Sequence, residues 1–155
     1  MQDIHFFPVL MRWLHITVAI VVGVGSIFAL VVVLPVVRGL EKEVRSELNE
    51  SMRKRFNMLF TIGITALIVS GFYNYIAIEV PRHHGQVLYH GIIMAKIVLA
   101  FVVFFVGSAL VGRSAAFEGM RRKRRRWMRR NVVLLLIIVA LAAILRAIPP
   151  AVGGG

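Results

Sequence analysis

The sequence predicts an all-α integral membrane protein, a bundle of four transmembrane helices with both termini outside the cytoplasm (N-out/C-out). Of its 155 residues, 59% are hydrophobic, and the mean hydropathy is +0.81. A soluble domain of this length could not bury so much apolar surface. Four apolar runs are long enough to cross a bilayer, and the charged residues are concentrated between them. We expect one membrane domain over residues 1–155.

The first span is predicted at residues 8–37. Its uncharged core, Trp13–Val37, can cross a bilayer with some tilt. This core is too long for the hydrophobic region of a cleavable signal peptide, so we expect a retained helix. Pro8 suits a first helical turn, where a missing N–H costs little. Pro35 is expected to bend or end the helix near its inner boundary.

The second and third spans are predicted at residues 56–78 and 87–112. The second carries no charge, whereas the third is interrupted by Lys96. In the connector 38–55, acidic and basic side chains recur at helical spacing, so we expect it to extend the second helix into solvent. The segment Glu79–Gln86 is predicted to be a tight polar turn between the two spans.

The fourth span is predicted at residues 131–148. It consists almost wholly of Val, Leu, Ile and Ala, with Arg146 near its end, and Pro149-Pro150 stops it. The connector before it, 113–130, is the most basic segment of the chain. Whether Gly153–Gly155 belongs to the natural protein is left open.

The Lys and Arg residues predict the orientation of the bundle. The first and third connectors hold six and nine of them, and the second connector holds only Arg82. Short basic loops stay in the cytoplasm, so we expect a multi-pass protein of a bacterial-type inner (cytoplasmic) membrane. Arg121–Arg130 is expected to attract anionic lipids. Nucleic acid is not expected as a partner, because Trp127 alone cannot form a stacking platform for bases.

The absent motifs exclude several chemistries. The chain has no cysteine, so disulfides, thiolate metal sites and cysteine nucleophiles are ruled out. It also has no Gly-rich phosphate loop, no HExxH motif and no suitably spaced Ser-His-Asp set, which leaves hydrolase and nucleotide chemistry without support.

Polar side chains gather on the predicted outer side of the bundle, and the inner half of every span is nearly devoid of ionisable groups. Such groups are costly inside a membrane and tend to mark function. The outer set comprises all five histidines and seven further residues: His5, His15, His83, His84, His90, Arg12, Asn74, Tyr75, Glu79, Arg82, Lys96 and Arg146.

Two of these histidines, His15 and His90, are the main candidates for a site. They lie on neighbouring helices at similar predicted depth, so their imidazoles could ligate a metal or a haem iron from opposite sides. Basic side chains toward the aqueous edge, namely Arg12, Arg82, Lys96 or Arg146, could then bind haem propionates. The alternative for each histidine is interfacial anchoring by a hydrogen bond to a neighbouring helix. For His5, His83 and His84 this alternative is preferred, because they lie near a terminus or in a solvated turn. His83 and His84 remain weaker candidates for metal ligands at the entrance to a site.

Lys96 is the third candidate. At 100° per residue it points about 120° away from His90, so the two are not expected to serve one ligand from the same helix face. It could pair with a carboxylate, with a propionate, or with Asn74 and Tyr75. The alternative is that its ammonium extends out to the membrane surface.

Copper is the alternative cofactor. Met11 and Met94 lie near His15 and His90 in the sequence, and thioether with imidazole suits copper(I). Methionine is also an ordinary filler of membrane helices.

The small residues within the predicted spans are interpreted as helix-packing positions. They are Gly23, Gly25, Ser26, Gly63, Ser70, Gly71, Gly107 and Ser108.

Several short motifs resemble the CopD and HemJ superfamily of small membrane proteins, over residues 10–113. They are Trp13–Ile16, Met52–Arg55, Leu67–Gly71 and Tyr89–Ala100. HemJ-type proteins are associated with haem binding and protoporphyrinogen oxidation, and CopD-type proteins with copper handling. The resemblance implies that His15 is the haem-ligand histidine and Lys96 the functional lysine.

Three functions are therefore open. The first is a b-type haem-binding membrane protein with a redox or electron-transfer role, the cofactor lying in the outer half of the bundle. The second is copper binding or transport, and the third an accessory subunit of a respiratory membrane complex. Whether the chain is an enzyme is left open; a haem-dependent membrane oxidoreductase is the class considered. A quinone or a redox protein as electron partner, and a homodimer, are also left open.

Overall fold

The computed structural model describes residues 6–151, and His5 and Gly153–Gly155 lie outside them. The described residues are almost wholly helical and contain no strand, which confirms the all-α prediction. Four helices are long and apolar enough to cross a membrane, which indicates a multi-pass membrane protein. They are Phe6–Arg38, Lys42–Arg82, Val87–Val111 and Arg124–Ala147.

The first helix has three parts, α1 (Phe6–Phe28), the π-helical η1 (Ala29–Val33) and α2 (Leu34–Arg38). Pro35 lacks an N–H and its ring would clash with the preceding turn, so the backbone widens into a π segment just before it. The helix therefore continues past Pro35 and ends at Arg38.

The second helix consists of α3 (Lys42–Tyr73), the π-helical η2 (Asn74–Glu79) and α4 (Val80–Arg82). It is longer than the predicted span at both ends. As expected, most of the first connector is helical and extends this helix. The predicted Glu79–Gln86 turn is shorter than expected, because helix persists to Arg82. Gly85, with φ +77°, supplies the left-handed residue that this tight turn requires.

The third helix, α5 (Val87–Val111), has nearly the predicted bounds. A 3₁₀ turn, η3 (Ala115–Phe117), and α6 (Glu118–Arg122) connect it to the fourth helix, α7 (Arg124–Ala147). This last helix begins well before the predicted span, because arginine is a good helix former and the run continues directly into apolar sequence.

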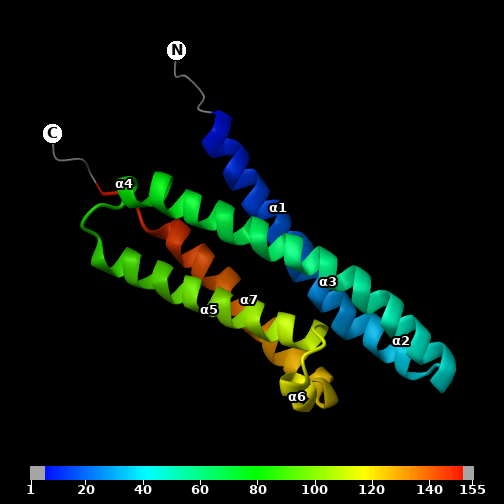
Figure 1. The fold of residues 1–155 in the computed structure, drawn as a ribbon. Coiled ribbons are helices and arrows are strands. Elements are labelled where there is room, and N and C mark those ends of the chain that lie inside the picture. The colour runs from blue at the N-terminus through cyan, green and yellow to red at the C-terminus, as the bar shows by residue number, and fades with distance from the viewer. Residues whose placement is uncertain (1–5, 152–155) are drawn as a thin grey trace.

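The four helices pack as two pairs (Figure 1). α1 lies along α3, and α5 lies along α7; contacts between the pairs, through α3 with α5 and α1 with α7, are less extensive. We call the space between the pairs the inter-pair seam. The loop before α5 and the C-terminal segment meet at one end, where the Ala151 N–H donates to the Arg82 carbonyl at 3.0 Å. This end holds α4 and is the α4 end below; the opposite end is the α6 end.

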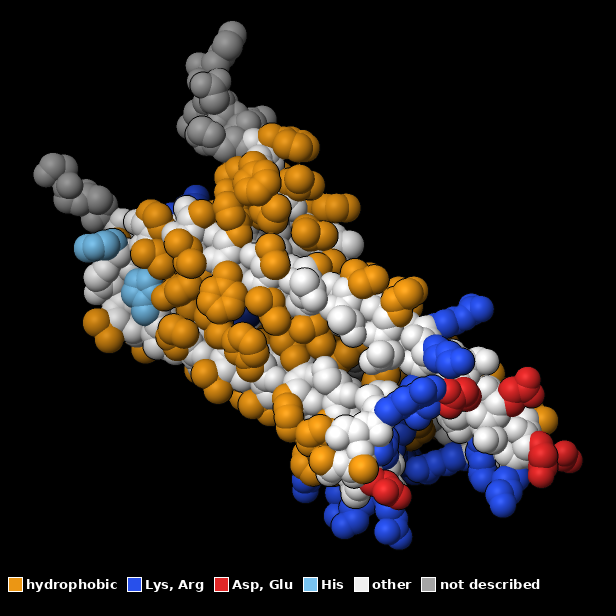
Figure 2. Space-filling view, in the orientation of Figure 1, with side chains coloured by type: hydrophobic (Ala, Val, Ile, Leu, Met, Phe, Trp, Pro, Cys, Tyr) orange, Lys and Arg blue, Asp and Glu red, His pale blue; other side chains and the backbone are white. Residues whose placement is uncertain are grey.

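The surface has the polarity of a membrane protein. Large apolar side chains such as Leu59, Val69 and Val98 stand well exposed along the helices, and Figure 2 shows apolar side chains over the middle of the bundle, with Lys and Arg gathered at the α6 end. A small buried cluster of Tyr89, Ile93 and Leu145 joins α5 to α7 near the α4 end.

Candidate functional site

His15 lies in the middle part of α1, against the buried face of α3. Its Nδ1 is 3.0 Å from the hydroxyl oxygen of Ser70, a residue with no exposed surface. The Ser70 hydroxyl donates its only proton to the Ala66 carbonyl at 2.5 Å. Ser70 must therefore accept from His15, so the His15 proton is on Nδ1.

This tautomer leaves Nε2 of His15 with a lone pair. Within residues 6–151 that nitrogen has no hydrogen-bond partner. It is also absent from the set of fully buried unpartnered atoms in that range, so it retains accessible surface. Gly71 makes the close approach possible, because a Cβ there would stand 3.0 Å from Cε1 of His15. The ring is thus held at Nδ1 and carries a lone pair on Nε2.

Lys96 of α5 is partly buried within the span. It lies within electrostatic range of His15 and of Glu79. The described part of the chain offers its ammonium no hydrogen bond and no ion pair within 4.0 Å. An unpaired ammonium in this position is costly, which makes it a candidate for binding an anionic ligand group.

Glu79, at the end of η2, is the centre of the polar network at the α4 end. One carboxylate oxygen accepts a 2.6 Å hydrogen bond from the Tyr89 hydroxyl and lies 3.6 Å from Nε2 of His83. The other lies 3.6 Å from the Arg12 guanidinium. Glu79 therefore connects α1, the second helix and α5. The sequence interpretation did not assign it a role.

His83 differs from the expectation of a solvated turn. It is only 5% exposed, and its ring stacks on Tyr89 with centroids 3.5 Å apart. Its Nδ1 donates to Gln86 Oε1 at 2.8 Å. The preceding turn is helical rather than loop, which directs this side chain inward. His84, one residue later, is exposed, so the two do not form a pair.

His90 uses both ring nitrogens within the protein. Nε2 donates to the His83 carbonyl at 3.1 Å, and Nδ1 therefore accepts from the Tyr75 hydroxyl at 3.3 Å. His90 packs beside Tyr75, whereas His15 packs beside Ser70, roughly one helical turn further from the α4 end. The two histidines thus lie at different depths, and His90 has no free lone pair.

Asn74 lies at the start of η2, and its Nδ2 donates to the Met11 carbonyl at 3.4 Å. Its Oδ1 is buried and has no hydrogen-bond partner among the residues that the structure describes. The π segment thus directs Asn74 to α1 and Tyr75 to His90. Such segments are frequent at functional sites because the wide turn re-aims side chains.

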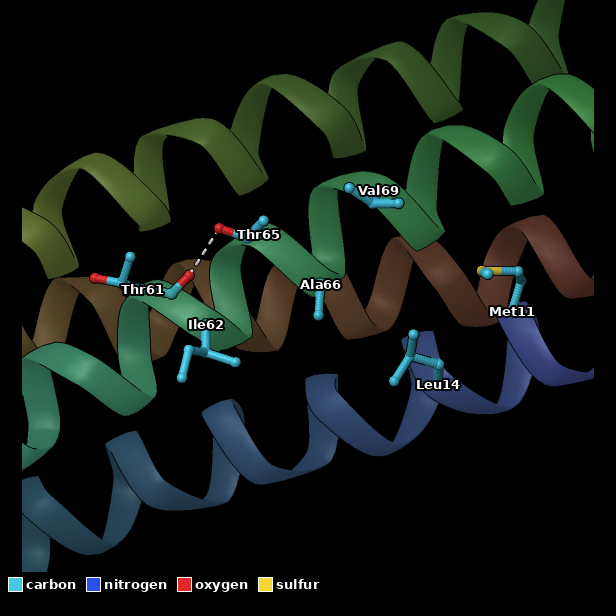
Figure 3. A pocket seen from close by; sticks show the side chains of 7 residues that line it. All are labelled: Met11, Leu14, Thr61, Ile62, Thr65, Ala66 and Val69. Atoms are coloured by element: carbon cyan, nitrogen blue, oxygen red, sulfur yellow. Dashed lines mark hydrogen bonds between the residues drawn. The ribbon is translucent and has the colours of Figure 1, made fainter.

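The remaining predicted residues do not converge. Met94 is 45% exposed, and Arg146 is exposed at the end of α7. Across residues 6–151 no group of three or more His, Asp or Glu side chains is arranged to hold a metal ion. Met11 instead lines a shallow apolar groove of about 420 Å³ between α1 and α3 (Figure 3), which His15 does not line.

Comparisons with protein-family models, with curated protein sequences and with solved structures give no match for this chain. The resemblance to the CopD and HemJ superfamily therefore stays a prediction.

Sequence reasoning missed the roles of Ser70, Glu79 and Tyr89. For Glu79 a signal was present, because it is the one acidic residue of 6–151 that falls in the outer set, among the basic side chains of Arg12, Arg82, Lys96 and Arg146. For Ser70 there was none, since a small residue in a membrane helix is ordinarily a packing position.

Proposed function

We propose that this protein binds a b-type haem in the half of the bundle nearest the α4 end and has a redox or electron-transfer role. The observation that carries the proposal is His15, whose Nδ1 is held by Ser70 and whose Nε2 is free. Metal-bound histidines characteristically donate from the other ring nitrogen, which fixes the tautomer and the ring orientation. Histidine is also the commonest protein ligand of b-type haem iron.

The chemistry of the neighbouring side chains fits this cofactor. A haem has anionic propionates, and Lys96 and Arg12 are cations for them. Lys96 has no ion pair in the described range, and Arg12 has only a 3.6 Å contact with Glu79. When bound, the haem would supply one-electron chemistry. The residues of the chain bind and orient it: His15 offers the ligand nitrogen, and Ser70 holds the ring.

His90 has a different role in the proposal. To coordinate iron it would have to give up its hydrogen bonds to Tyr75 and to the His83 carbonyl. We assign it as a positioning residue that fixes the loop and η2 around the site. His15 is then the one histidine ligand proposed, and the sequence-based expectation that His15 and His90 ligate from opposite sides is not part of the proposal.

The proposal includes an orientation. The α6 end holds the basic connectors and would face the cytoplasm of a bacterial-type inner membrane. The α4 end and both termini would then face outward, in an N-out/C-out arrangement. The cofactor would lie in the outer leaflet half, accessible to a quinone or a redox protein.

The first test is the visible spectrum of the full chain purified in mild detergent, oxidised and dithionite-reduced, with haem and copper assays on the same sample. We expect a Soret band and sharpened bands on reduction. The variant His15→Ala should lose most of its haem, and added imidazole should restore part of it by replacing the missing ligand.

Two histidine variants serve as controls. His84→Ala removes an exposed histidine and should leave the haem content unchanged. His90→Ala should retain coordinated iron, because neither of its ring nitrogens is free to be a ligand. A His15→Ala protein with a full haem spectrum would contradict the ligand assignment. A colourless wild-type protein that carries stoichiometric copper would replace haem with the copper alternative.

A further inference from the structure

A second candidate site lies at the α6 end, away from His15. A cavity of about 220 Å³ opens between the end of the first helix and the start of α7, lined by Leu34, Pro35, Arg38 and Arg125. Its lining is both apolar and cationic. The apolar residues belong to the last turns of the first span, and the two guanidinium groups lie at the boundary where that span ends.

Both arginines are free to bind a ligand. Arg38 and Arg125 are exposed, and within 6–151 neither forms an ion pair or a side-chain hydrogen bond. Some other arginines at this end are already engaged. Arg113 pairs with Glu50, and Arg121 donates to the Ser114 carbonyl at 2.7 Å. The positive charge of Arg38 and Arg125 is therefore not neutralised by an acidic side chain among the described residues.

Arg124 precedes Arg125 in α7 but does not line the cavity. It is partly buried, and its Nε is fully buried with no hydrogen-bond partner among residues 6–151. Two exposed guanidinium groups that line one cavity favour the binding of an anion that accepts hydrogen bonds from both. Phosphate oxygens match the planar donors of arginine.

We propose that this cavity binds the phosphodiester headgroup of one anionic phospholipid. A lipid fits better than a free anion, because its acyl chains would continue from Leu34 and Pro35 along the exposed apolar surface of the first helix. Basic pockets between transmembrane helices are typical sites for such headgroups. This site is independent of haem and more specific than general attraction to the basic connector.

The test is native mass spectrometry of the delipidated full chain, titrated with phosphatidylglycerol or with phosphatidylcholine of the same acyl chains. We expect one phosphatidylglycerol per chain to bind in preference to phosphatidylcholine. Replacing both cavity arginines, Arg38→Gln with Arg125→Gln, should weaken phosphatidylglycerol binding about tenfold or more, because charged hydrogen bonds are lost. The matched control is Arg122→Gln with Arg126→Gln, which removes the same charge from exposed residues outside the cavity.

Three results would overturn the proposal. Equal weakening in the two double variants would show general electrostatic attraction. Equal binding of the two lipids would show that the site does not distinguish an anionic headgroup from a zwitterionic one. Displacement of phosphatidylglycerol by inorganic phosphate at the same concentration would assign the site to free phosphate. If the Gln variant does not fold, Arg38→Lys with Arg125→Lys keeps the charge but loses the planar donors, and it should still weaken binding.

Discussion

At the scale of single residues, the pairing of His15 with Ser70 organises the candidate site. The Ser70 hydroxyl is fully buried, donates to its own helix and accepts from the imidazole. A hydroxyl in this arrangement decides which ring nitrogen carries the proton. The Ser70 side chain thereby leaves the lone pair on Nε2, the atom that we propose as the haem ligand.

Ser70→Ala tests this role directly. The substitution removes the acceptor for His15 Nδ1–H, and a buried unsatisfied donor costs about 1–3 kcal/mol. We expect ¹⁵N NMR of the labelled histidine ring to show loss of the Nδ1–H tautomer. Thr65→Ala is the matched control, since Thr65 makes the same bond to a carbonyl four residues earlier but is exposed and does not contact His15. An unchanged tautomer in Ser70→Ala would contradict this role.

The limits of sequence reasoning are also clearest at this scale. A histidine inside an apolar run is conspicuous, so His15 and His90 could be selected as candidates. Whether a ring nitrogen is free depends on partners distant in sequence, such as Ser70 for His15 and the His83 carbonyl for His90. The burial of His83 could not be predicted, because it follows from the helix continuing through Arg82.

At the scale of elements, π-helical segments precede the two prolines that lie beyond the first turn of a long helix. η1 precedes Pro35, and η2 precedes Pro81. The approximate positions of the spans could be predicted from hydropathy, whereas these irregular turns could not. A proline predicts disturbance of the helix, but neighbouring packing decides whether the helix ends or widens. At η2 the widened turn orients three side chains toward other helices. Asn74 contacts Met11, Tyr75 contacts His90, and Glu79 contacts Tyr89.

The packing of α3 on α5 depends on a glycine. A Cβ on Gly107 would overlap the ring of Phe60, whereas a Cβ on Gly91 of the same helix would meet nothing within 4 Å. Gly107 was predicted to be a packing position, and its contact with Phe60 confirms it. The glycine allows one of the two contacts that join the helix pairs to be close.

We expect Gly107→Ala to destabilise the bundle by about 1–3 kcal/mol, because Phe60 must leave its position. Gly91→Ala should be neutral or stabilising by up to about 1 kcal/mol, since alanine is the better helix former and has room there. SDS titration of the purified variants, followed by circular dichroism, measures both. If the two variants have the same stability, the α3–α5 contact is looser than the structure indicates.

At the scale of the whole molecule, charge is divided between the two ends of the bundle. The α6 end holds the long basic connectors, and the α4 end holds the polar network around Glu79. The middle is apolar and exposed, as lipid contact requires. This division follows directly from the sequence, because it depends on the order of apolar and basic segments and not on side-chain geometry. Which end faces the cytoplasm is the part that requires measurement.

The absence of cysteine makes that measurement simple, because each introduced cysteine is the only thiol in the chain. His84→Cys places it in the exposed loop at the α4 end, and Ser114→Cys in the exposed segment before α6. Neither residue contacts the His15 site. In spheroplasts, a membrane-impermeant maleimide should label His84→Cys at once and Ser114→Cys only after permeabilisation, because the basic connectors resist translocation. The reverse labelling pattern would show that the bundle has the opposite orientation, with His15, Lys96 and Glu79 in the cytoplasmic half of the membrane. The haem proposal would survive that inversion, but electrons would then have to be exchanged with a partner on the cytoplasmic side.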